Sequence, residues 1–328
     1  MSELRRAVYL PHAPDLDLVQ RLDADGFESL WTEEGQGRTA FGKLTRWASV
    51  TESVGLGTCI VNVFSRTPAA LAQEAATLDE FSDGRAILGL GVAHPGVVED
   101  FHGVEFDRPL ARMEEYIRLV RRYLAGDPEA FDGEFFTPTR TTTWSAFEPV
   151  RSEIPIYNAA LGPSNLRLTG EFADGWLPAW YPLDGFDEAR ANLATGAERA
   201  DRDLSDIDVA RYVPVAVSDD PSTARFAVAE RIARTYRDIP GYYDRVAKER
   251  GFEDEVERAR AADTTREAAE QVSDEFIDLV SVAGAPETVR DREQAMVDAS
   301  VDLVIYGIGP VLDDDELRRE TLDAIAPS

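Results

Sequence analysis

The sequence predicts an α/β protein, a (β/α)8 TIM barrel with helical insertions, built as a single domain over residues 1–328. Short apolar runs typical of buried strands alternate with amphipathic stretches, and eight such strand–helix repeats follow one another. This alternation requires parallel strands joined by right-handed crossovers. An open doubly wound sheet is the alternative. Against it, Pro-His-Ala-Pro-Asp follows the first strand, where a nucleotide-binding sheet would have Gly-x-Gly-x-x-Gly.

The first four repeats begin at residue 7. Leu18, Val19 and Leu22 fall on one face of the first helix, and Gly26 ends that helix. Pro68 is suited to the first turn of the third helix, with Thr67 as its N-cap. The expected strands are 7–10, 28–32, 57–63 and 85–91, and the expected helices are 16–27, 40–53, 68–81 and 111–126.

Four more strands complete the predicted barrel, and two insertions interrupt its repeats. The strands are expected at 154–160, 174–180, 207–218 and 302–308, with helices at 163–173, 185–200, 286–301 and 313–326. One insertion, around 126–153, is interpreted as a loop or small extra segment, and the other, around 221–282, as several helices. Residues 276–284 could form a ninth strand. They continue a helical pattern from Thr265, however, so we expect a helix there.

The charge is the most unusual feature of the composition. The formal net charge is -28, and arginine supplies every basic residue except Lys43 and Lys248. This balance excludes a basic face that binds nucleic acid. The acids are dispersed along the chain, which is typical of a solvated surface. Abundant carboxylate with scarce lysine also resembles the proteins of salt-loving archaea, and we favour that interpretation.

Several classes of protein and site are excluded by what the sequence lacks. No run of 18 or more apolar residues predicts a membrane span, and the N-terminal Met-Ser-Glu-Leu-Arg-Arg does not begin a signal peptide, so we expect a cytoplasmic protein. A single cysteine excludes an intrachain disulfide. The three histidines, His12, His94 and His102, lack metal-ligand spacing, so no metal is expected.

In a TIM barrel, chemistry takes place on the loops that follow the carboxyl ends of the strands. This rule selects His12, Glu33, Glu34, the segment 62–66, His94, the turn 160–163, Trp180, Tyr181 and the loop after Ile308. Glu33 and Glu34 could be the carboxylate pair of a glycosidase, but neighbours on a strand point to opposite faces. His94 is either an ordinary loop histidine or a catalytic one.

A turn in the middle of the chain has the features of an anion site. A predicted strand ends in Ala160 and Leu161, Gly162 and Pro163 turn the chain, and a helix begins. The N–H groups at a helix N-terminus bind phosphate. A second glycine turn, at Gly175–Trp176, is expected beside it. The alternative is an ordinary strand–helix turn.

Five segments, in chain order, resemble the luciferase-like family of flavin and deazaflavin enzymes. They are GFESLWTEE (26–34), GLGTCIVNVFSRTPAALAQEAATLDEFSDGRAILGLG (55–91), RPLARMEEYIRLVRRYLAGD (108–127), IPIYNAALGPSNLRLTGEFADGWL (154–177) and SDIDVARYVPVAV (205–217). Within that family, the chain is most similar to F420-dependent methylenetetrahydromethanopterin reductases. The resemblance covers nearly the whole chain and implies the same barrel fold.

The resemblance implies that coenzyme F420 binds at the carboxyl ends of the strands. It also implies a non-proline cis peptide and a bulge in the third strand, which by position falls at Cys59–Ile60. An apolar strand that carries a cysteine and an asparagine is then a strand that faces a cofactor. The implied cofactor-binding residues are Cys59, Ile60, Val61, Asn62, Ala160, Leu161, Gly162, Pro163, Gly175 and Trp176.

Three differences from the reductase pattern leave the substrate open. A strand-one glutamate is replaced near Val8, an aspartate–histidine pair is Glu33–Glu34 here, and an aspartate after the fourth strand is His94. Hydride transfer at the deazaflavin ring needs a group that handles the accompanying proton. Glu33, Glu34 and His94 are the candidates for this catalytic role. The residues expected to bind substrate are His12, Trp180 and Tyr181.

These observations lead to three functional hypotheses. The first is an F420-dependent oxidoreductase acting on a small organic molecule, with 5,10-methylenetetrahydromethanopterin and methylenetetrahydrofolate as candidate substrates. The second is an FMN-dependent luciferase-like monooxygenase, and the third is a barrel that binds or stores the deazaflavin without catalysis. A homodimer or larger homo-oligomer is expected.

The charge generates a prediction about stability. Carboxylate repulsion should loosen the fold as salt is removed, because the Debye length grows from roughly 3 Å at 1 M to roughly 30 Å at 0.01 M. We expect the melting temperature, followed by circular dichroism, to fall steadily from molar to millimolar NaCl. A melting temperature that stays level or rises on desalting would contradict adaptation to high salt.

Overall fold

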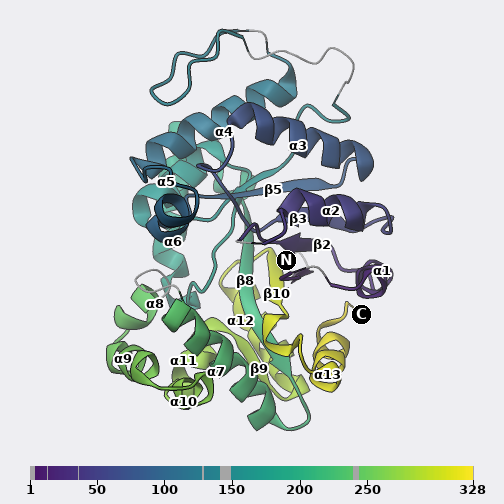
Figure 1. Cartoon of the computed structure of the whole chain (residues 1–328), viewed down its shortest axis with the longest axis vertical. Coiled ribbons are helices and arrows are strands. Elements are labelled where there is room, and N and C mark those ends of the chain that lie inside the picture. Colours follow the sequence, from purple (N-terminus) through teal and green to yellow (C-terminus); the bar gives the residue numbers. More distant parts are fainter. Residues whose placement is uncertain are drawn as a thin grey trace. The chain divides into compact units, whose positions relative to one another are not determined.

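The computed structural model describes residues 4–12, 14–35, 37–127, 129–140, 149–238 and 244–327. The chain divides into two compact units. Unit 1 comprises Met1–Pro11, Pro178–Asp187 and Ala210–Ser328, and unit 2 comprises His12–Leu177 and Glu188–Val209. Each unit contains parallel strands covered by helices (Figure 1). Among the described residues, no helix is long and apolar enough to cross a bilayer.

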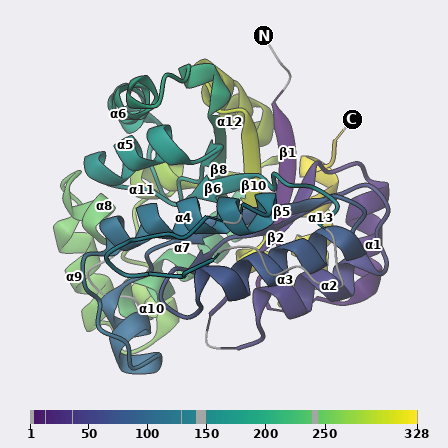
Figure 2. The same ribbon diagram turned by 90° about the horizontal axis from the view of Figure 1, so that it is seen from above.

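Unit 2 contains a parallel sheet with strand order β2-β3-β5-β6-β7, with β4 also paired to β5. The strands are β2 (Ser29–Thr32), β3 (Gly55–Thr58), β4 (Val61–Asn62), β5 (Ala86–Gly91), β6 (Ile156–Asn158) and β7 (Gly175–Trp176). The helices are α1 (Leu16–Ala24), α2 (Ala40–Ala48), α3 (Pro68–Phe81), α4 (Pro109–Ala125) and α5 (Pro163–Phe172), followed by α6 (Phe186–Arg199), which begins in unit 1. Helices α2, α3 and α4 lie in a row, each against the next (Figures 1 and 2).

Unit 1 contains the strand order β1-β10-β8-β9, again parallel throughout. Its strands are β1 (Arg5–Tyr9), β8 (Asp208–Val217), which begins in unit 2, β9 (Val282–Gly284) and β10 (Leu303–Gly307). Its helices are α7 (Pro221–Asp238), α8 (Asp244–Lys248), α9 (Glu253–Ala261), α10 (Thr265–Ala269), α11 (Asp274–Val280), α12 (Pro286–Asp298) and α13 (Asp315–Ile325). In both views, α7 to α11 gather into one helical cluster, as expected for the 221–282 insertion (Figures 1 and 2).

The repeating parallel β/α units are those of a (β/α)8 TIM barrel, so the predicted fold class is confirmed. All eight expected strands are present, although 174–180 shortens to the two residues of β7. The expected helix 40–53 ends at Ala48. In the 126–153 insertion, residues 129–140 contain no helix or strand, and 141–148 lie outside the described residues.

The expectation of continuous helix over 276–284 was wrong. Helix α11 ends at Val280, and residues 282–284 form β9, which pairs with β8 at Val215↔Val282. The helical pattern from Thr265 is real, since it covers α10 and α11, but it stops at Ser281. Three buried residues are too short a run to display the two-residue period of a strand. The pairing that defines β9 comes from residues far away in the sequence.

Helices α5 and α6 approach closely at two glycines. A Cβ at Gly170 would lie 2.1 Å from the carbonyl oxygen of Leu193, and one at Gly196 would lie 1.9 Å from that of Arg167. Only glycine permits this contact between backbones. The two glycines therefore determine where α5 packs, and with it the position of the turn 160–163 that precedes α5.

Candidate functional site

Polar residues lie at, or shortly after, the carboxyl ends of four neighbouring strands of unit 2, at one edge of the sheet. Asn62 of β4 pairs with Gly91 of β5, and Leu90 of β5 pairs with Asn158 of β6. Because the strands are parallel, their carboxyl ends meet at the same edge. Glu33 follows β2 and His94 follows β5, so both join this edge. The structure thus brings most of the sequence-predicted site residues to one end of one sheet.

The third strand contains a bulge at its carboxyl end. Gly57 of β3 pairs with Ile87 of β5, whereas Val61 of β4 pairs with Leu90, so three residues of β5 face four residues of the β3–β4 segment. The extra residue lies between Thr58 and Val61, and the Cys59–Ile60 peptide bond is cis. The resemblance implied both features, and both are confirmed. A bulge of this kind redirects the side chains beyond it.

At the bulge, the side chain of Thr58 makes the hydrogen bonds that a neighbouring strand backbone would otherwise make. Its hydroxyl Oγ1 accepts a hydrogen bond from Gly89 N and donates one to Gly89 O, both at 2.8 Å. Both partners are buried, and a Cβ at Gly89 would lie 1.8 Å from Thr58 O. One hydroxyl therefore satisfies both backbone groups of Gly89 that the bulge would leave unpaired.

Asn62 shapes the turn beyond the bulge. Its side chain is 4% exposed, and its Oδ1 accepts hydrogen bonds from Phe64 N at 3.0 Å and Ser65 N at 2.8 Å. This use of the side-chain oxygen explains the asparagine in an otherwise apolar strand. Val61 is fully buried, whereas Cys59 and Ile60 are half-buried. The role of these four residues in binding a cofactor remains a prediction.

The adjacent carboxylates of Glu33 and Glu34 have different partners. Glu34 accepts hydrogen bonds from both terminal nitrogens of Arg66 and, at 3.0 Å, from Ala40 N. Arg66 also binds Glu74, through a 2.6 Å contact between Nε and Oε2. Burial would lower the pKa of Arg66, but the hydrogen bonds and charge of Glu34 outweigh it and raise that pKa. Glu34 is therefore bound to a cation that stays charged.

Glu33 faces a lysine. Lys43 Nζ lies 2.8 Å from Glu33 O and 3.3 Å from Glu33 Oε1, and the same carboxylate oxygen accepts a weak 3.5 Å bond from His12 N. His12 itself is exposed and has a positive φ of 65°. Glu33 also lies close enough to Cys59 for its charge to act on the thiol. Four sequence-predicted residues therefore form one group: His12, Glu33, Glu34 and Cys59.

His94 begins the turn that follows β5. Its carbonyl oxygen accepts hydrogen bonds from Val97 N and Val98 N at the start of a π-helical turn, Gly96–Phe101. The side chain is half-buried, and this burial lowers the pKa of His94 below its usual value. At pH 7 the imidazole is therefore neutral. A neutral imidazole can both donate and accept a proton.

The turn 160–163 presents the N-terminus of α5. Gly162 is the N-cap residue and provides no side chain to the helix end, and the space where its Cβ would be is open. Ala160 O accepts a 2.8 Å hydrogen bond from Trp176 Nε1, which fixes the turn to β7. A Cβ at Gly175 would lie 2.2 Å from the ring of Tyr157. Ala160, Leu161, Gly162, Pro163 and Trp176 thus form a second group at this edge.

A buried amide network supports the same turn. Asn158, at the end of β6, donates from Nδ2 to Asn165 Oδ1 at 2.8 Å and to Thr169 Oγ1 at 2.9 Å. Thr169 in turn donates to Asn165 O. The side chains of α5 are thereby held against the strand that leads into the turn.

The two aromatic residues expected to bind substrate belong to unit 1. Trp180 is buried and has a positive φ of 58°. Tyr181 packs edge-to-face with Phe186 at 5.8 Å, and its carbonyl oxygen accepts a 3.2 Å bond from Arg211 Nε. Their role in substrate binding stays a prediction.

Sequence reasoning gave no role to one cation of the site and missed the other. Arg66 was selected only as the end of the segment 62–66, and Lys43 was not selected at all. The signal for Lys43 was available, because it is one of only two lysines among 34 basic residues. Within the described ranges, no group of three or more His, Cys, Asp or Glu side chains is arranged to hold a metal ion.

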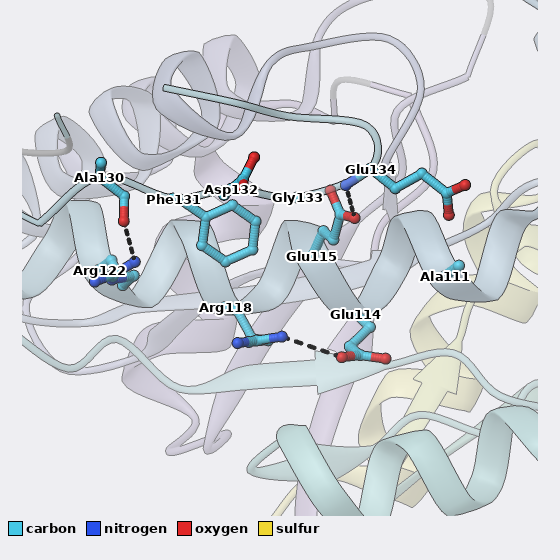
Figure 3. A pocket seen from close by; sticks show the side chains of 10 residues that line it. All are labelled: Ala111, Glu114, Glu115, Arg118, Arg122, Ala130, Phe131, Asp132, Gly133 and Glu134. Carbon is cyan, nitrogen blue, oxygen red and sulfur yellow. Dashed lines mark hydrogen bonds and ion pairs between the residues drawn. The ribbon is translucent and has the colours of Figure 1, made fainter. Parts of the chain in front are cut away.

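A cavity of about 440 Å³ lies elsewhere in unit 2, between α4 and residues 130–134 (Figure 3). Its charged side chains bind one another or the adjacent loop. Arg118 contacts Glu114 at 3.2 Å, Arg122 donates to Ala130 O, and Glu115 accepts from three successive N–H groups, those of residues 134–136. It contains none of the sequence-predicted site residues, and its interactions are those of a folded loop.

Comparison with known proteins identifies the family. The model of the luciferase-like monooxygenase family matches residues 11–303. The chain belongs to this family. Its relatives include F420-dependent enzymes. It is 33% identical over 288 residues to a Mycobacterium tuberculosis protein provisionally named a coenzyme F420-dependent oxidoreductase, with 82% of this chain and 83% of that protein covered.

Two reductases named for tetrahydromethanopterin or its methylene derivative are also similar. The 5,10-methylenetetrahydromethanopterin reductase of Archaeoglobus fulgidus is 31% identical, over 81% of this chain and 80% of its own. Among solved structures, the coenzyme F420-dependent tetrahydromethanopterin reductase of Methanopyrus kandleri matches with a TM-score of 0.85 and 28% identity, covering 98% of this chain and 97% of that one. The barrel fold is therefore shared along essentially the whole chain.

The bulge generates a prediction about stability. Replacing Thr58 with valine keeps the shape but leaves Gly89 N and O buried without partners, which costs about 1–3 kcal/mol for each unpaired group. We expect Thr58→Val to lower the free energy of unfolding, measured by urea titration, whereas Thr58→Ser, which keeps the hydroxyl, loses much less. A loss in Thr58→Val no larger than the loss in Thr58→Ser would show that the hydroxyl contributes no more to stability than the methyl group does.

Cys59 should be unreactive in the folded protein. Burial, with a smaller contribution from the charge of Glu33, raises the pKa of its thiol to about 12, so the reactive thiolate is scarce at pH 8. We expect iodoacetamide at pH 8 to leave the native protein unmodified, as followed by mass spectrometry, and to alkylate it once in urea. Alkylation at similar rates in both conditions would be evidence against the raised pKa of the thiol. Cys59→Ala should retain much of the activity.

Proposed function

We propose that this chain is an F420-dependent oxidoreductase that transfers a hydride between coenzyme F420 and a small organic substrate. The observation that carries the proposal is the match to the F420-dependent reductase of Methanopyrus kandleri, at 28% identity over nearly all of both chains. The M. tuberculosis and A. fulgidus relatives, at 31–33% identity, support the same cofactor class.

The residues at the carboxyl edge of unit 2 fit a deazaflavin that carries a phosphodiester. The uncapped N-terminus of α5, with open space at Gly162, suits the phosphate, because N–H groups there lack side-chain acceptors. The bulged segment 59–62 presents backbone and small or aliphatic side chains at the same edge, as a flat ring requires. When bound, F420 supplies hydride transfer, and the protein supplies orientation and proton handling.

Three groups of the chain are candidates for handling the proton. Glu34 is bound by Arg66 and Ala40 N, so a large part of its hydrogen-bonding capacity is already used. His94 is neutral at pH 7 and can act as acid or base. Glu33 pairs with Lys43 close to Cys59. The arrangement favours Glu33 and His94 for proton transfer and Glu34 for support of the turn that contains Arg66.

For the substrate, we propose a methylene-tetrahydropterin, 5,10-methylenetetrahydromethanopterin or methylenetetrahydrofolate, which would be reduced at its one-carbon unit. The names of the A. fulgidus and M. kandleri relatives support this class. Glu33–Glu34 and His94, where the reductase pattern has other residues, are the positions at which the specificity could differ. We also propose that the protein is adapted to high salt and that it forms a homo-oligomer.

The cofactor assignment is tested by equilibrium titration of F420 and FMN, because the matching family model is that of luciferase-like monooxygenases and FMN is the alternative cofactor. We expect F420 to bind more tightly. FMN binding tighter by more than tenfold, about 1.4 kcal/mol, would refute the proposal. The control is a variant with a side chain in the open space at the helix N-terminus, Gly162→Glu, which should weaken the binding of either phosphate-bearing cofactor.

The substrate is tested by stopped-flow spectroscopy in molar salt, which follows the oxidation of reduced F420 by a methylene-tetrahydropterin and, separately, the reduction of oxidised F420 by alcohols or sugar phosphates. We expect rapid oxidation with the methylene-tetrahydropterin and no reduction by the alcohols or sugar phosphates. Tight F420 binding without turnover on any member of that panel would favour a deazaflavin-binding or storage protein.

A further inference from the structure

Lys43 is an unusual residue in this chain. Arginine supplies all but two of the 34 basic residues, yet the cation that contacts Glu33 is a lysine. It lies on α2 with its side chain 3% exposed, whereas Lys248, the other lysine, has a side chain 36% exposed and belongs to unit 1. A buried lysine in a chain that otherwise uses arginine suggests a requirement that arginine does not meet.

The contacts of Lys43 are concentrated on one residue. Its Nζ donates to Glu33 O at 2.8 Å and contacts Glu33 Oε1 at 3.3 Å. The ammonium group thus holds both the main chain and the carboxylate of Glu33 where β2 ends. The other charged groups that act on Lys43 are Glu34 and Arg38.

The neighbouring pair, Glu34–Arg66, differs from Glu33–Lys43 in one chemical respect. Glu34 is held by Arg66, and a guanidinium does not lose its proton in proteins. An ammonium group does, and burial lowers the pKa of Lys43, while the charge of Glu33 opposes that change. Of the two carboxylate–cation pairs at this edge, Glu33–Lys43 is the one that can change its charge. It is neutral with Lys43 protonated and carries -1 after Lys43 loses its proton.

We propose that Lys43 is a positioning residue that fixes Glu33 at the carboxyl end of β2, and that the Glu33 carboxylate held in this way handles the proton of the reaction. This inference rests on the proposed function and deepens it, because it selects Glu33 from three candidates. It also assigns a role to a residue that does not itself need to touch substrate or cofactor.

The presence of only two lysines makes the pair directly observable. In protein labelled with ¹³C,¹⁵N-lysine, the ¹³Cε resonances give two signals, and Lys248→Arg assigns them. We expect Lys43 in the cofactor-free protein to titrate below 10.5. Glu33→Gln should shift its midpoint further down, because the opposing carboxylate charge is removed, and should leave the Lys248 signal unchanged. A Lys43 midpoint that Glu33→Gln does not move would overturn the inference, whatever the cofactor proves to be.

Activity then tests the role of the pair. We expect Lys43→Met and Lys43→Arg to reduce kcat at least tenfold, to change KM and F420 affinity much less, and to abolish the alkaline change in the kcat–pH profile. Arginine would restore a merely structural positive charge but does not titrate, so full rescue by Lys43→Arg would contradict the proposal. Lys248→Met is the matched control and should behave like the unsubstituted protein. Thermal melts establish that each variant is folded.

The two proposals fail in different ways. If the unsubstituted protein does not bind F420, the proposed function fails, and with it the role in turnover, even where the lysine titration shows coupling. If F420 binds and turns over but the Lys43 variants keep the kcat–pH profile of the parent, the proposed function stands and the role of Lys43 is refuted.

Discussion

The double hydrogen bond between Thr58 and Gly89 is the interaction on which the site edge of unit 2 depends. Strands β3 and β5 pair regularly up to Gly57, and β4 and β5 pair again from Val61, one residue out of step. Between these ladders, one hydroxyl group satisfies both the N–H and the carbonyl of Gly89. The mismatch therefore costs no buried, unpaired backbone group at that residue. The segment beyond it can then turn toward the strand ends, where Asn62 closes the loop.

The strong negative charge of the chain makes the distribution of its few cations informative. With 62 acidic residues against 34 basic ones, the chain has too few cations to give each carboxylate one of its own. At the candidate site, however, Glu33 and Glu34 each have one, and Arg66 joins Glu34 to Glu74. Two adjacent carboxylates can stay close together because each is compensated by a different cation. The choice of lysine for one and arginine for the other gives the pairs different responses to pH.

The sequence was sufficient to predict the strands and helices that have a strong local signal. Apolar runs and caps such as Thr67–Pro68 located most elements, and the family resemblance located the cis bond at Cys59–Ile60. What could not be predicted arises from contacts between distant residues. Strand β9 is defined only by its pairing with β8.

The candidate site shows the same division between local and distant signals. Its position followed from the rule that parallel strands share one carboxyl edge, which placed Glu33, Asn62 and His94 together. The hydroxyl of Thr58 and the ammonium of Lys43 escaped notice because their partners lie 31 and 10 residues away. Nothing in the local sequence links either residue to its partner.

The distribution of the two lysines has a practical consequence for handling the protein. Amine-reactive reagents attack only accessible, unprotonated amines, and the side chain of Lys43 is almost wholly shielded. Among lysine side chains, Lys248 is therefore the single point of attachment for a succinimidyl ester dye, a biotin tag or an activated resin. Once the N-terminal amine is blocked, coupling through Lys248 would give a uniformly oriented, singly labelled protein and leave Lys43 of unit 2 untouched. In most proteins of this size that outcome requires engineering, and here it follows from the near absence of lysine.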